Sequence, residues 1–209
     1  DPQFTMDLPK KITATTGIDA LSQAIESYWC VNSTIESKEY SKNAIDLIIN
    51  NLIGAVNNPS KKNRLIMSKA SNLAGKAINI TKTTAPHAIS YPITSYFGVP
   101  HGHAVALTLP SILVYNSKIT KKDCLDKRGV KYVKNIMKDI IQLVGGTDEY
   151  DAKKKIEALM GEINLETGLK GVGISDFKII LEKGFSPDRV NNNPRKLTKT
   201  NLNKILIEL

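Results

Sequence analysis

With 209 residues, 41% of them hydrophobic and 23% charged, the chain is large enough for one domain with a sizeable core, and its composition is ordinary for a globular protein. No apolar run approaches the ~18 residues that a membrane-spanning helix needs, so we expect no membrane partner. The net charge of +9 has three explanations: a solvated basic surface, an anionic substrate, or nucleic acid, which we do not expect because no recognition motif accompanies the charge.

The first segment, residues 1–15, is predicted to be an extended linker, because Pro2 and Pro9 disfavour helix around them. The opening DPQFTMDLPKK has no initiator Met and resembles the middle of a protein, which indicates a fragment. Residues 16–209 are predicted to form one helical domain. The polar start is unlike a signal peptide, and the few cysteines do not form a disulfide framework, so we expect a cytoplasmic protein.

Helical spacing of apolar residues dominates the rest of the chain. The predicted helices are 17–29, 34–56, 61–80, a short helix from 85 that contains Pro92, 101–115, 130–144, 152–165, a helix from 176, and 201–209. The predicted N-caps are Thr13, Thr15 or Thr16 for the first helix, a Ser33–Glu36 capping box for the second, and Ser60, Ser175 and Thr198 for later ones. Because no strand pattern appears, the sequence predicts an all-α fold.

One polar stripe stands out in the first predicted helix. Asp19, Gln23 and Glu26 recur at positions i, i+4 and i+7, so their side chains point the same way. Such a stripe can line a site. Alternatively, Asp19 is only a first-turn carboxylate that favours the helix dipole.

All three histidines, His87, His101 and His103, lie between Thr83 and Leu109. Neutral imidazole is the commonest metal ligand in proteins, and imidazole titrates near neutral pH. The cluster therefore indicates a metal or acid–base site. The alternative is that His87 belongs to the core and that the other two histidines only shape a turn.

Three motifs resemble one known family: TGIDALSQAIESY, APHAISYPITSYFGVPHGHAVALTLP and NNNPRKLT. Together they are similar to the C-terminal helical domain of the iron-containing (group III) alcohol dehydrogenases, which have a dehydroquinate synthase-like fold. The resemblance implies an all-α helical-bundle domain, with the family's N-terminal Rossmann-like domain absent from this chain.

The resemblance also implies a metal site. The family holds Fe²⁺ or Zn²⁺ with one aspartate and three histidines, and Asp19, His87 and His101 match three of these ligands. Gln23 stands where the family has its other histidine, so the implied metal site is weaker, because divalent transition metals favour nitrogen over an amide oxygen. Alternatively, Gln23 only hydrogen-bonds the substrate, and His87, His101 or His103 stabilises the developing oxyanion as an imidazolium.

The implied reaction is hydride transfer between NAD(P)H and an aldehyde. The motifs resemble the subgroup that reduces phosphonoacetaldehyde to 2-hydroxyethylphosphonate, and the residues expected to bind substrate are Lys82, Thr83, Thr84, Tyr91 and His103. Two alternatives remain: a butanol-, glycerol- or 4-hydroxybutyrate-type dehydrogenase, and a non-catalytic basic helical binding module. Since the chain has no Gly-rich dinucleotide fingerprint, we expect the isolated chain to be inactive. We expect the full-length protein to be a homo-oligomer.

Overall fold

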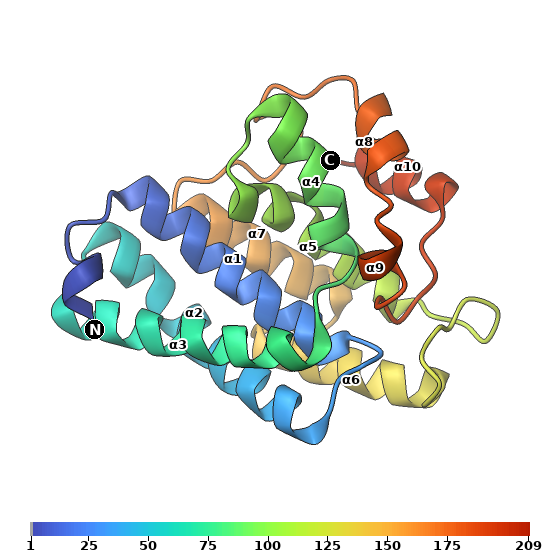
Figure 1. The fold of residues 1–209 in the computed structure, drawn as a ribbon, viewed down its shortest axis with the longest axis horizontal. Coiled ribbons are helices and arrows are strands. Elements are labelled where there is room, and N and C mark those ends of the chain that lie inside the picture. The colour runs from blue at the N-terminus through green and yellow to red at the C-terminus, as the bar shows by residue number, and fades with distance from the viewer. Residues whose placement is uncertain (1) are drawn as a thin grey trace.

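The computed structural model describes residues 2–209, which form helices joined by loops (Figure 1). In chain order the elements are η1 (Pro2–Thr5), α1 (Lys10–Trp29), α2 (Ile35–Asn57), α3 (Lys61–Thr81), α4 (Ala85–Phe97), α5 (His101–Ser117), α6 (Val130–Leu143), α7 (Glu149–Glu162), α8 (Lys178–Lys183), α9 (Pro187–Val190) and α10 (Lys199–Ile207). No strand occurs among residues 2–209, so the predicted all-α fold class is confirmed. None of the helices in this range combines the length and apolar character needed to cross a membrane.

The central helix is α1, which packs against α2 and α3 on one side and against α5 on another (Figure 1). Its apolar stripe, including Ile18, Leu21 and Ile25, is completely buried. At Gly17 α1 and α2 lie close together, because a Cβ there would lie 2.3 Å from Leu52 Cδ1 of α2 and the Leu52 side chain would have to move. Close packing on both sides makes α1 a fixed support for the polar residues that it carries.

The carboxyl-terminal helices cover the end of the domain that contains α4. Both α8 and α9 pack on α4, and α10 packs on α5 and α8. Two buried side-chain amides connect this segment to α5. Asn193 Nδ2 donates to Asn116 Oδ1 at 2.8 Å, and Asn116 Nδ2 donates to Asn193 Oδ1 at 3.1 Å. The predicted turn at residues 191–194 is therefore anchored to the end of α5, and it places α9 beside α4.

The predicted start of the first helix was wrong. The extended linker was expected to reach residue 15, but η1 lies within it and α1 already begins at Lys10. Pro9 restricts the backbone of the residue before it, not of those after it. Pro9 is itself the N-cap of α1, a position whose backbone N–H makes no hydrogen bond within the helix, so its lack of an N–H costs nothing there. The threonines expected as caps lie inside α1, where Thr13 and Thr16 donate to backbone carbonyls one turn earlier.

The other predicted caps were partly right. Ser60 and Thr198 accept hydrogen bonds from the backbone N–H groups of residues 63 and 201, as predicted. The predicted capping box is displaced by one residue, because Thr34 and Ser37 form it. Ser175 caps no helix, since α8 begins at Lys178. Each error is a small displacement along the chain that leaves the helix itself in place.

Candidate metal centre

Three of the predicted ligands meet at one point. Asp19 of α1, His87 of α4 and His101 of α5 offer ligand atoms that all lie within 4.8 Å of one another. The two imidazole rings are 5.3 Å apart between centroids, with an interplanar angle of 66°. His87 Nε2 lies 3.4 Å from Asp19 Oδ1. The three groups thus face a common space although they come from separate helices.

A glycine allows α5 to bring His101 to α1. Gly102 follows His101 directly, and a Cβ at Gly102 would lie 2.0 Å from the Thr15 carbonyl oxygen and 2.7 Å from Asp19 Cβ. No other residue fits without moving one of the two helices. The contact between α1 and α5 at this point therefore requires the glycine that the sequence provides next to the histidine.

Asp19 has one oxygen engaged and one without a hydrogen bond. Gln23 Nε2 donates to Asp19 Oδ2 at 3.0 Å, so the Gln23 amide holds the carboxylate in place in this orientation. Asp19 Oδ1 is buried, and no residue among 2–209 donates a hydrogen bond to it. Its contact with His87 Nε2, at 3.4 Å, is close enough for an ion pair but is not a hydrogen bond. A buried carboxylate oxygen without a donor, aimed at two imidazoles, fits a divalent cation.

Glu26 lies behind His87 and is completely buried. Its Oε2 accepts from His87 Nδ1, and its Oε1 accepts from the backbone N–H and hydroxyl of Thr84, at 2.9 and 2.8 Å. A proton fixed on Nδ1 leaves the Nε2 lone pair facing Asp19. No role was predicted for Glu26, although it lies on the stripe that Asp19 and Gln23 share, and that stripe is the signal in the sequence that points to it.

A serine supports His101 in a similar way. Ser90 Oγ donates to the His87 carbonyl at 2.8 Å and lies 3.4 Å from His101 Nδ1. Because the Ser90 proton is engaged elsewhere, its oxygen is free to accept from Nδ1, which leaves Nε2 of His101 as the ligand atom. Ser90 is fully buried and was also missed from the sequence.

The two histidines differ in basicity. Burial lowers the pKa of His87, but the Glu26 and Asp19 carboxylates outweigh that effect and raise it to about 9. Burial lowers the pKa of His101, against the opposing effect of Asp19. Without a metal, a proton on His87 therefore neutralises part of the carboxylate charge, and a bound cation would replace that proton.

The third histidine does not join the cluster. His103 Nε2 donates to the Glu166 carbonyl at 2.7 Å and lines a different hollow together with Lys10 and Lys11. Two residues along a helix correspond to a rotation of about 200°, so His103 leaves α5 on the other side from His101. The structure therefore separates His103 from the metal ligands, and its expected catalytic and substrate-binding roles stay predictions.

The remaining predicted substrate residues lie in three different places. Tyr91 stacks on His101, with centroids 5.9 Å apart and planes within 20°, and Thr83 receives a hydrogen bond from Arg189. Thr84 is completely buried, and its hydroxyl is committed to Glu26 and Trp29, so it supports the site from behind. Lys82 is exposed at the end of α3, where it adopts a left-handed backbone with φ of 68°.

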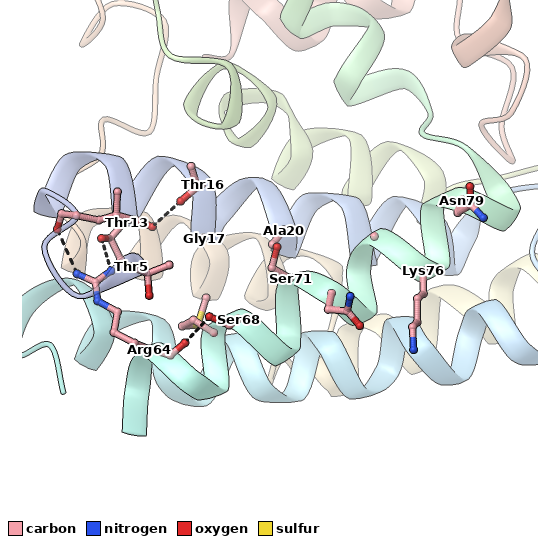
Figure 2. A pocket seen from close by; sticks show the side chains of 14 residues that line it. Thr5, Thr13, Thr16, Gly17, Ala20, Arg64, Ser68, Ser71, Lys76 and Asn79 are labelled. Atoms are coloured by element: carbon pink, nitrogen blue, oxygen red, sulfur yellow. Dashed lines mark hydrogen bonds between the residues drawn. The ribbon is translucent and has the colours of Figure 1, made fainter. Parts of the chain in front are cut away.

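A hollow of about 820 Å³ lies on the α3 side of α1, and none of the three clustered ligands lines it (Figure 2). At one end of it Arg64 is buried and donates to Thr13 Oγ1 at 2.6 Å and to the Leu8 carbonyl at 3.2 Å. Figure 2 shows the Arg64 side chain reaching up from α3 to this segment. Arg64 thus joins the start of α1 and the segment before it to α3.

The chain is similar to known proteins over nearly its whole length. The model of the Fe-containing alcohol dehydrogenase family, C-terminal, matches residues 13–209. The phosphonoacetaldehyde reductase of Streptomyces viridochromogenes is 31% identical over 208 residues, which are 99% of this chain and 52% of that protein. The 1,3-propanediol dehydrogenase of Klebsiella pneumoniae is 30% identical over 210 residues, 94% of this chain and 50% of that protein.

Solved structures agree with these matches. The sulfoacetaldehyde reductase of Bifidobacterium kashiwanohense, solved in complex with NAD⁺, aligns with a TM-score of 0.83 and 32% identity, over 100% of this chain and 53% of that one. The alcohol dehydrogenase of Oenococcus oeni aligns with a TM-score of 0.86 and 29% identity, over 100% and 54%. The chain spans about half the length of the curated relatives it matches. It belongs to the Fe-containing alcohol dehydrogenase family and corresponds to that family's C-terminal, helical domain.

Proposed function

We propose that this chain is the metal-binding and substrate-binding half of an NAD(P)-dependent aldehyde reductase that converts phosphonoacetaldehyde to 2-hydroxyethylphosphonate. The observation that carries the proposal is the convergence of Asp19, His87 and His101, with ligand atoms within 4.8 Å of one another. One carboxylate and two neutral imidazoles suit Fe²⁺ or Zn²⁺. The family's members, described as alcohol dehydrogenases and aldehyde reductases, support the same chemistry.

The chain's own residues would hold and orient the reacting groups. Asp19, His87 and His101 would bind the metal, and Gln23 would become a weak fourth ligand if its amide turns its oxygen inward. When bound, the cation supplies a Lewis acid that polarises the substrate carbonyl. The aldehyde gains a hydride at carbon and a proton at oxygen, while NAD(P)H is oxidised to NAD(P)⁺. Glu26 keeps the His87 lone pair directed at the site throughout.

Two comparisons favour an anionic aldehyde as the substrate. One similar protein is named a phosphonoacetaldehyde reductase, and one similar structure is a sulfoacetaldehyde reductase. Both names describe a short aldehyde that carries a tetrahedral oxyanion. The net charge of +9 would attract such a substrate. A neutral or carboxylate substrate is the competing proposal, since relatives of similar identity include 1,3-propanediol and butanol dehydrogenases.

The nucleotide would be bound mainly outside this chain. We propose that NADH or NADPH binds to a nucleotide-binding half that these 209 residues do not contain, and that the full-length protein is a cytoplasmic homo-oligomer. The hydride donor would then reach the cluster across the boundary between the two halves. The same arrangement explains why we expect the isolated chain to be inactive.

The test uses the full-length enzyme with its metal loaded as Fe²⁺ or Zn²⁺. Oxidation of NADH and NADPH is followed with phosphonoacetaldehyde, butanal and 4-oxobutanoate as substrates, beside a His101→Ala variant. We expect metal-dependent turnover that is fastest with phosphonoacetaldehyde and lost in the variant. Absence of both metal binding and turnover would overturn the dehydrogenase assignment, whereas faster turnover of butanal would overturn only the choice of substrate.

A further inference from the structure

A cation lies close to the candidate metal centre and comes from a distant part of the chain. Arg189 of α9 donates through Nη1 to the Thr83 hydroxyl, 106 residues earlier in the sequence. Its guanidinium carbon lies 5.2 Å from the centroid of the Tyr91 ring, and Tyr91 stacks in turn on His101. Arg189, Tyr91 and His101 therefore form a chain of contacts that ends at a candidate metal ligand.

Arg189 has no carboxylate partner among the residues that the structure describes. Two other arginines of the same chain are paired: Arg128 with Asp126 and Arg195 with Asp123, each at 2.7 Å. The acid next to Arg189 in sequence, Asp188, is exposed and makes no ion pair with it. The half-buried guanidinium therefore keeps its positive charge, and most of its donors, free for a ligand.

The contacts place the Arg189 charge beside the centre. The guanidinium lies against Tyr91, whose ring centroid is 5.9 Å from that of His101. Arg189 therefore lies near the metal ligands rather than on a remote surface. A negative group bound between Arg189 and the cluster would be attracted by both.

The segment from α9 to Asn192, which carries Arg189, is held in this position by hydrogen bonds. Asn192 Nδ2 donates to the Thr83 carbonyl at 3.0 Å and to the Asp188 carbonyl at 2.7 Å. The first bond fixes the loop to the start of α4, and the second closes the turn that carries Arg189. An arginine fixed in this way loses little conformational entropy when it binds an anion.

We propose that Arg189 binds the anionic group of the substrate, a tetrahedral phosphonate or sulfonate, while the aldehyde group of the same molecule faces Asp19, His87 and His101. This inference rests on the proposed function. The planar guanidinium can donate two parallel N–H bonds to a tetrahedral oxyanion, and the Thr83 hydroxyl provides a further donor beside it. A neutral alkanal would leave the guanidinium unpaired at the site, so Arg189 would select for charged aldehydes.

The experiment compares Arg189→Gln and Arg189→Lys with wild type in the full-length, metal-loaded enzyme. Values of kcat and KM are measured for phosphonoacetaldehyde, sulfoacetaldehyde and the neutral propanal. In Arg189→Gln, we expect the preference for either anionic aldehyde over propanal, as a ratio of kcat/KM, to fall about 10- to 100-fold, mainly through KM. Arg189→Lys should recover part of the preference. Lys183→Gln, which removes an exposed charge from neighbouring α8, is the matched control and should leave the ratio unchanged.

Binding gives a second measurement that does not need turnover. Titration calorimetry with 2-hydroxyethylphosphonate and with 2-hydroxyethanesulfonate should show the same 10- to 100-fold weakening in Arg189→Gln, and the tighter of the two identifies the natural anion. An unchanged preference and unchanged binding in Arg189→Gln would overturn the role of Arg189, even in an active dehydrogenase. If no aldehyde is reduced and no metal is bound, the proposed function fails instead.

Discussion

Replacing Glu26 by glutamine tests how the centre is built. Glu26 is completely buried, and its carboxylate accepts from His87 Nδ1 and from Thr84. Glutamine keeps the volume and can still accept from Thr84, but it removes the negative charge and presents an NH₂ group to the imidazole. That NH₂ group requires Nδ1 to be an acceptor, so the His87 proton would move to Nε2, where a metal ligand is needed.

The magnitude follows from the pKa of His87, which is raised from 6.5 to about 9. Since one pKa unit is worth about 1.4 kcal/mol, the raised value corresponds to roughly 3 kcal/mol of stability. A raised histidine pKa stabilises the folded chain fully below pH 6.5, and this contribution is lost as the pH rises to about 9. In Glu26→Gln only Asp19 still opposes the effect of burial on the His87 pKa, so most of the pH-dependent contribution should disappear.

The assay is urea denaturation of the chain, with EDTA present to remove metal, at several pH values between 6 and 9.5. We expect the destabilisation caused by Glu26→Gln to shrink by up to roughly 3 kcal/mol across this range. Other titrating groups cancel because wild type and variant are compared at each pH. Glu182→Gln, which changes an exposed carboxylate of α8, should show no such trend. A destabilisation by Glu26→Gln that is independent of pH would refute the His87–Glu26 pairing.

Three further predictions concern single residues. His101→Ala should weaken Zn²⁺ binding about a hundredfold in a chelator competition, while His103→Ala should leave Zn²⁺ binding unchanged. Equal effects of the two variants would contradict the separation of these side chains on α5. Gln23→His should tighten Zn²⁺ binding about tenfold in the same competition, because an imidazole would replace an amide; no gain would mean that residue 23 does not reach the metal. Gly102→Ala should lower the free energy of unfolding by roughly 1–3 kcal/mol in urea denaturation, since its Cβ would lie 2.0 Å from the Thr15 carbonyl oxygen. An unchanged free energy of unfolding would show that α1 and α5 can move apart.

The sequence by itself determined most of the local structure. Helical periodicity placed the main helices, and the side chains of Ser60 and Thr198 marked two of their starts, because a cap depends on backbone groups only three residues away. The largest error, the start of α1, arose because Pro9 was taken to disfavour helix after it as well as before it. The motif resemblance also selected Asp19, His87 and His101, which the folded chain brings together.

Only the tertiary structure decided how these side chains are supported and what surrounds them. Glu26 acquires its role from His87, 61 residues away, and Arg189 reaches Thr83 across 106 residues. His103 was predicted to bind substrate near His101, and the structure shows that the helical rotation directs it to the Glu166 carbonyl. Periodicity and capping are properties of residues that are close in sequence. The ion pairs, the hydrogen bonds that orient the candidate ligands, and the direction in which each helix face points depend on which segments pack together. That packing is settled by the whole core, and no local pattern in the chain contains it.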